Sequence, residues 1–92
     1  MAELGLLARN IIDNIEQTSL LYYQNNEAEA GKSMQKLITN LTGFVDALDD
    51  EQKINEILDR LREALQAMED RDYVYLADLL KYEIGEIISE YI

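Results

Sequence analysis

The residues with the clearest chemical potential are carboxylates. Glu83 and Glu86 are spaced so that a helix presents both on one side, where they offer two oxygens to a hard cation. A carboxylate-rich di-metal site needs ligands from several helices, and one pair does not supply them. Near Asp49, the acidic run lacks the glycine and the terminal bidentate glutamate of a calcium loop. A metal binder or enzyme built around Glu83 and Glu86 therefore remains only an alternative interpretation.

Two residue types that carry much of protein chemistry are missing. The 92-residue sequence contains no histidine, which removes the commonest general base, the usual zinc ligands and a histidine phosphorelay. It contains no cysteine, which removes disulfides and thiol nucleophiles. We therefore predict a protein that is not an enzyme and has no cofactor, metal site or catalytic residue.

The net charge of −11 restricts the class of partner. Nucleic acids and anionic membranes are bound by clustered Lys and Arg, whereas the eight basic residues here are dispersed. Such a charge favours solubility and a basic partner. The first ten residues lack the features of a signal peptide, and no apolar run approaches the ~20 residues of a membrane span. We predict a cytoplasmic protein that binds neither nucleic acid nor membrane.

Four helices must position these side chains. Apolar residues recur with helical spacing over residues 3–23, 27–48, 50–69 and 73–91, separated by short polar breaks. Asn26, Asp72 and either Asp49 or Asp50 are the expected N-cap residues. Short connections imply antiparallel neighbours, so the predicted fold is all-α, an up-down-up-down four-helix bundle that forms one domain over residues 1–92. The alternative is a pair of helical hairpins that completes its core only in a dimer.

The third predicted helix has the clearest apolar stripe, and its polar residues face away from it. Ala64 lies on the border of this stripe, whose members are Ile54, Ile57, Leu58, Leu61, Leu65 and Met68. We expect the stripe to face the core.

The last predicted helix has no plainly polar side. At 100° per residue, its core face contains Leu76, Leu79, Leu80, Glu83, Ile84 and Ile87. Glu83 is therefore predicted to be an inward-facing carboxylate that needs a partner. The remaining surface is also largely apolar, which predicts a candidate partner interface of Val74, Tyr75, Asp78, Tyr82, Gly85, Ile88 and Ile92.

A helix that is apolar on several sides is usually buried on more than one of them. We therefore predict a non-enzymatic protein–protein interaction module, a homodimer formed through the fourth helix. The alternative is a chaperone or adaptor that binds an amphipathic partner helix in an apolar groove.

The segment Ala64–Ile88 resembles part of a family of small, uncharacterised all-helical bacterial proteins. Its features are an acidic turn and an aromatic residue, Asp72 and Tyr73, followed by Leu-Ala-Asp-Leu-Leu-x-Tyr-Glu over residues 76–83. In general architecture the chain is also similar to flagellar export chaperones, which are short acidic helical bundles. That resemblance implies a role in holding an unfolded partner.

Overall fold

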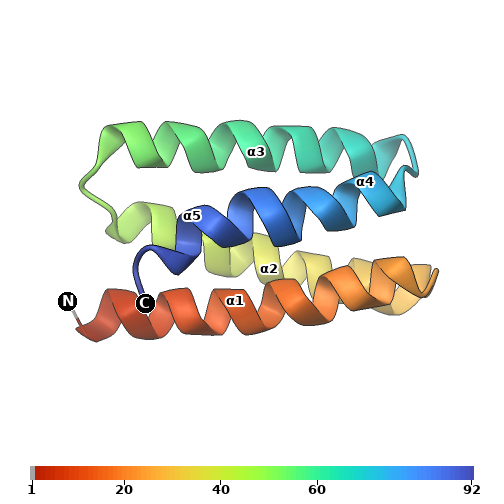
Figure 1. Ribbon diagram of the computed structural model, residues 1–92, viewed down its shortest axis with the longest axis horizontal. Helices are drawn as coiled ribbons and strands as arrows, with labels where there is room; N and C mark the ends of the chain where they lie inside the picture. Colours follow the sequence, from red (N-terminus) through yellow and green to blue (C-terminus); the bar gives the residue numbers. More distant parts are fainter. Residues whose placement is uncertain (1) are drawn as a thin grey trace.

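Four antiparallel helical rods run up, down, up and down in the computed structural model of the protein, which describes residues 2–92 (Figure 1). They are α1 (Ala2–Tyr23), α2 (Glu27–Ala47), α3 (Glu51–Glu69) and a fourth helix built from three consecutive elements. These elements are α4 (Tyr73–Asp78), the π-helix η1 (Leu79–Ile84) and α5 (Gly85–Ser89). The predicted all-α four-helix bundle is confirmed. Its 36 Å length is close to the ~33 Å that a 22-residue α-helix spans.

Two of the three turns reverse the chain through a residue in the left-handed region. Asn25 has φ 62° and Arg71 has φ 58°. At both turns, the backbone N–H of the next residue donates a hydrogen bond to the carbonyl oxygen five residues earlier in the chain. This bond closes the end of the preceding helix. Asparagine tolerates this conformation well, whereas arginine does so at a cost.

The three predicted N-cap positions are confirmed, with Asp50 rather than Asp49 before α3, but only Asp50 makes a side-chain cap hydrogen bond. The Asp50 carboxylate accepts hydrogen bonds from the backbone N–H groups of Gln52 and Lys53, at 3.1 and 3.3 Å. Asn26 and Asp72 occupy the N-cap positions of α2 and α4, but their side chains make no cap hydrogen bond. Both residues have ψ 74° directly after the left-handed residue, outside the extended conformation that aims a capping side chain at the first amides.

Small side chains let three pairs of neighbouring helices approach closely. Between α1 and α2, the hydroxyls of Thr18 and Ser33 hydrogen-bond at 2.5 Å. Between α1 and α4, the Ser19 hydroxyl donates to the Ala77 carbonyl at 3.4 Å. Ala64 and Ala67 line the side of α3 that is buried, and α3 packs closely on α4 and η1.

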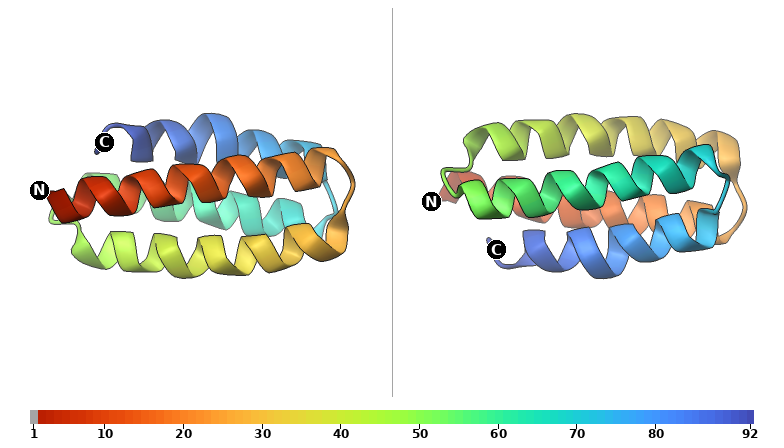
Figure 2. Two further views of the ribbon diagram at one scale, coloured as in Figure 1. Left: turned by 90° about the horizontal axis from the view of Figure 1, so that it is seen from below. Right: turned by 90° about the horizontal axis from the view of Figure 1, so that it is seen from above.

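The fourth side of the bundle, between α2 and α3, is different. The two helices follow each other in sequence, and Figure 2 shows them as neighbours, yet their backbones do not approach closely along their length. Large branched side chains face this side, including Val45 on α2 and Leu58 and Leu61 on α3. Their bulk keeps the backbones apart, because the distance between two helix axes depends on the side chains at the contact.

The π-helix η1 changes the direction in which the later side chains of the fourth helix point. Its last hydrogen bond runs from the Gly85 N–H to the Leu80 carbonyl, five residues back. Leu76, Leu80, Ile84 and Ile88 are all fully buried, at a constant spacing of four residues. A regular α-helix would carry the last of them about 120° away from the first, and the wider π turn keeps all four in the core.

The core is filled by apolar side chains from every helix. Phe44 packs edge-on against Tyr91 with ring centroids 5.3 Å apart, which joins α2 to the C-terminal end of the chain. At the opposite end, Tyr22 and Tyr73 stack at 5.1 Å. The fully buried large residues are Ile11, Ile15, Met34, Leu37, Leu41, Phe44, Ile57, Leu76, Leu80, Ile84 and Ile88.

Candidate functional site

The predicted interface on the fourth helix is only partly exposed. Val74 and Tyr82 present 62% and 56% of their surface to solvent, and Tyr75 and Ile92 are also exposed. Asp78 is half-buried, because its carboxylate accepts a hydrogen bond from the hydroxyl of Tyr23 on α1. The outer face of the fourth helix therefore retains aromatic and aliphatic groups, mainly at its N-terminal half.

Two members of the predicted interface are buried. Ile88 belongs to the core, and Gly85 is also buried within the chain. Predicting them as partner contacts was wrong, because that prediction placed every side chain of the fourth helix at the regular α-helical rotation of 100° per residue. The π-helix η1 accommodates one extra residue in its wider turn, so all later side chains point about 100° away from their positions in a regular α-helix.

The same rotation corrects the position of Glu83. Its side chain is 50% exposed and lies on the side of the fourth helix that faces α3, where it pairs with Arg60 at 3.5 Å. The predicted inward-facing carboxylate is therefore wrong. Ile84 occupies the core position instead, and Glu83 is a solvated partner of an arginine.

Tyrosine hydroxyls tie α4 to each of the other three helices. Tyr23 of α1 donates to Asp78, Tyr73 donates to Glu27 of α2, and the third bond joins Tyr75 to Glu63 of α3. The hydrogen bond to Asp78 raises the pKa of Tyr23 to about 12. Hydrogen bonds to carboxylates also raise the pKa of Tyr73 and of Tyr75. These contacts position α4, and the raised pKa values keep the three phenols protonated to a more alkaline pH than usual.

A polar cleft lies between α3 and the segment formed by η1 and α5. Arg60 bridges Glu63 and Glu83, and Lys53 bridges Glu56 and Glu90. The hydrogen bond to Glu90 raises the pKa of Lys53. Each base is thus held between carboxylates, an arrangement typical of a solvated ion-pair network.

Metal ligands do not gather at this cleft or elsewhere in the described chain. Among residues 2–92, no group of three or more Asp, Glu, His or Cys side chains is placed to hold a metal ion. Within the same range, no helix combines the length and the apolar character needed to cross a membrane.

An apolar hollow of about 230 Å³ opens on the side where α2 and α3 do not pack closely. Its lining residues are Leu41, Thr42, Val45, Asp46, Leu58 and Leu61. Leu58 and, two turns further along α3, Leu65 are 39% and 37% exposed. We call this side of the molecule the α2–α3 groove.

The groove was missed at the sequence level, because its leucines were assigned to the core. The observed centre of the buried face of α3 lies at Ile57, Ala64 and Ala67, turned away from Leu58 and Leu65. One signal was available. The two alanines on one flank of the stripe favour close packing there and leave the leucines on the other flank facing a wider gap.

Fold and surface together define a small, acidic, all-helical bundle with an apolar groove between α2 and α3. The chain belongs to the family described as domain of unknown function (DUF8042), which matches residues 1–91. No match is found among curated proteins or among solved structures. The predicted resemblance to an uncharacterised family is confirmed at this level. A bacterial origin and a likeness to export chaperones stay predictions.

Proposed function

We propose that this protein is a non-enzymatic protein-binding module whose binding site is the α2–α3 groove. The observation that carries the proposal is the exposure of large leucines along a side of the bundle that the chain does not close. Leu58 and Leu65 are 39% and 37% exposed beside half-buried Val45 and Leu61. Clustered exposed apolar side chains with polar borders are typical of interaction surfaces.

The dimensions of the groove favour a helix as the bound element. Leu58 and Leu65 are seven residues apart, so they repeat after about two turns, or ~10.5 Å, on the same side of α3. A helix with apolar residues at positions i, i+3, i+4 and i+7 presents matching side chains over that length. This arrangement supports the adaptor or chaperone form of the proposed function.

The composition and the polar cleft support a non-enzymatic role. Without histidine or cysteine, acid–base chemistry at neutral pH would fall to carboxylates. In the cleft, however, Glu56, Glu83 and Glu90 are engaged by Lys53 or Arg60, and Glu86 lines the cleft outside these ion pairs.

The test is site-specific crosslinking in cells of the source organism. A photoreactive amino acid replaces Leu65 in the groove or, as a matched control, Leu20 on α1, which is 54% exposed. The proposal expects a crosslinked protein partner from position 65 and none from position 20. Equal crosslinking from both positions, or none from position 65, would contradict it.

A second candidate function, self-association through the fourth helix, is favoured by the exposure of Val74 and Tyr82. Light scattering across concentration measures it directly. We expect a dimer that becomes a monomer when both residues are replaced by serine but persists in the variant Leu65→Gln. A wild-type chain that stays monomeric at high micromolar concentration would remove this candidate.

A further inference from the structure

We infer that the partner of the α2–α3 groove is an amphipathic helix whose apolar stripe is flanked by Lys and Arg side chains. This inference rests on the proposed function, since it specifies the chemistry of what that groove binds. It is carried by the distribution of charge around the groove.

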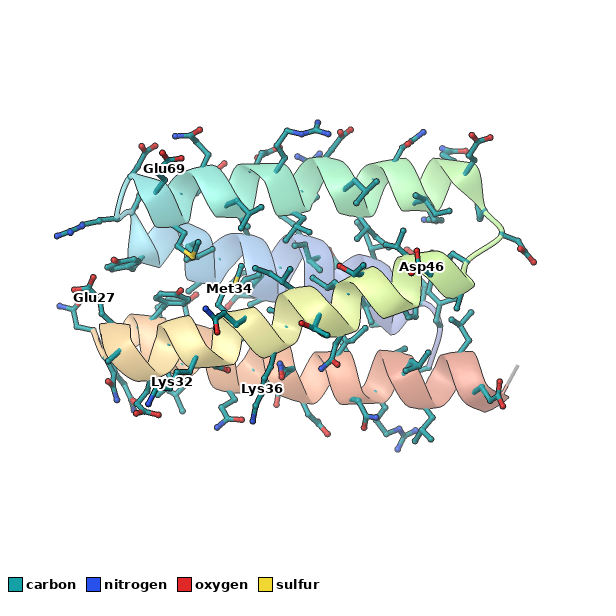
Figure 3. The ribbon with its side chains drawn as sticks, turned by 180° about the vertical axis from the view of Figure 1, so that it is seen from behind. Glu27, Lys32, Met34, Lys36, Asp46 and Glu69 are labelled. Carbon is teal, nitrogen blue, oxygen red and sulfur yellow. The ribbon has the colours of Figure 1, made fainter. Side chains whose placement is uncertain are left out.

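The edges of the groove are acidic. Asp46 belongs to its lining on α2, and Glu69 lies at the other end of α3, at the same end of the bundle as Glu27, the first residue of α2 (Figure 3). The connection between α2 and α3, at the end nearer Asp46, adds Asp49, Asp50 and Glu51. Carboxylates therefore lie at both ends of an apolar floor.

The basic residues of α2 and α3 do not offset these acids. Lys32 and Lys36 lie on the opposite side of α2, toward α1, as Figure 3 shows. On α3, Arg62 pairs with Asp59 at 3.2 Å, while Lys53 and Arg60 are engaged in the polar cleft. One further base, Arg71, lies in the turn after Glu69, so the acids around the groove still outnumber the bases near it. This excess of carboxylates makes a cationic helix the complementary partner.

A second copy of the chain is the less favourable occupant. Each copy carries a net charge of −11. Val74 and Tyr82 are among the most exposed apolar side chains, and Asp78 lies between them in sequence. Docking this face into the groove would bring carboxylates against carboxylates, which is unfavourable.

The experiment uses two synthetic peptides of about 18 residues, long enough to span ~27 Å as a helix. Both carry Leu at i, i+3, i+4 and i+7, and one has Lys and Arg on the flanks where the other has Glu. Binding to the full chain is measured by fluorescence anisotropy at low and high salt. We expect the basic peptide to bind at least about tenfold more tightly, with an advantage that salt reduces.

Variants of the chain locate the effect. Leu65→Gln should weaken the basic peptide at least about fivefold, because it removes apolar surface from the floor. Asp46→Asn with Glu69→Gln should reduce the preference for the basic peptide. Asp13→Asn with Glu16→Gln, on exposed positions of α1, is the matched charge control and should leave the preference unchanged.

The outcomes separate the two proposals. Equal binding of both peptides, still sensitive to Leu65→Gln, would overturn the basic-partner inference and leave the groove function standing. If the basic peptide binds the Leu65→Gln variant as tightly as the wild type, the binding site lies elsewhere, and both the groove function and the basic-partner inference are overturned. Failure of both peptides to bind, together with a dimer that Leu65→Gln dissociates, would identify a second copy as the occupant and overturn the inference.

Discussion

At the residue scale, tyrosine hydroxyls hold the start of the fourth helix against each of the other three helices. The acceptors are carboxylates, Asp78 for Tyr23, Glu27 for Tyr73 and Glu63 for Tyr75. A hydrogen bond to a charged acceptor is stronger than one between neutral groups, and it exists only while the phenol keeps its proton. These bonds therefore make the position of α4 sensitive to alkaline pH.

The substitution Tyr23→Phe tests this sensitivity. The pKa of Tyr23 is about 12 in the folded chain, against an ordinary value of 10, so the bond stabilises the fold fully below pH 10 and is lost as pH rises through 12. We expect the variant to be less stable than the wild type at pH 8, with a difference that closes between pH 10 and 12. Urea unfolding followed by circular dichroism measures it. A difference that stays constant over this window would contradict the assignment.

The left-handed conformation of Arg71 should make glycine the more stable residue at this position. With φ 58°, an arginine is strained, whereas glycine is not. After allowance for the greater entropy of unfolded glycine, Arg71→Gly should raise the free energy of unfolding by about 1 kcal/mol. Arg62→Gly, within α3, is the control and should lower it by about 1 kcal/mol. Urea denaturation of both variants measures the two effects, and a loss of stability in both would show that the turn gains nothing from glycine.

At the element scale, the π-helix η1 decides which side chains of the fourth helix face the core. Gly85 contributes to this turn through its N–H, and a Cβ added there would lie 3.2 Å from the Leu80 carbonyl oxygen. The absence of a side chain thus leaves room for that carbonyl. A straight α-helix would instead place Glu83 near the core and turn Ile88 away from it.

Deleting Tyr82 is the sharpest test of this element. The deletion removes the residue that the wide turn takes up, so the buried positions become spaced by four, three and four residues, the pattern of a regular amphipathic α-helix. We expect a folded bundle whose free energy of unfolding lies within about 1 kcal/mol of the wild type. Circular dichroism and urea denaturation measure this outcome.

Deletion of Asp59, an exposed residue of α3, is the matched control. There the helix has no extra residue to lose, so all later side chains turn by about 100° and Ala64 and Ala67 leave the core. We expect this variant to be destabilised by several kcal/mol or to remain unfolded. If the Tyr82 deletion is equally damaging, the π turn is required for folding and the argument from spacing fails.

At the scale of the whole molecule, the number, length and order of the helices follow from the spacing of apolar residues and the polar breaks between them. The direction of the side chains in the second half of the fourth helix does not follow from that spacing, because the extra residue in η1 depends on packing against three neighbouring helices. The same limit applies to α3. The apolar pattern places Ala64 on the border of the stripe, whereas the structure buries Ala64 and leaves Leu58 39% exposed. Which flank of the stripe is buried depends on how closely each adjacent helix can approach. The alanines on one flank of α3 were therefore a partial signal for the groove, and its position also depends on how the helices pair.

The net charge of −11 leads to the last prediction, which concerns salt. The bundle is about 19 Å thick at its narrowest, and the Debye length falls from about 30 Å at 0.01 M salt to about 3 Å at 1 M. At low salt the excess carboxylates therefore repel one another across the whole molecule, whereas at high salt only adjacent charges interact. The exposed ion pairs weaken too, but each contributes no more than about 1 kcal/mol.

Repulsion should dominate this balance, since 19 acidic residues face only eight basic ones. We expect the melting temperature to rise with sodium chloride by several degrees, as about 1 kcal/mol shifts a domain of this size by 4–8 °C. Asp13→Asn with Glu16→Gln should raise the melting temperature at low salt and reduce its increase with sodium chloride. This result separates screening of charge from a general salt effect on apolar burial. A melting temperature that falls with salt would mean instead that the ion pairs at Lys53 and Arg60 outweigh the repulsion and that the polar cleft is the dominant electrostatic feature of the fold.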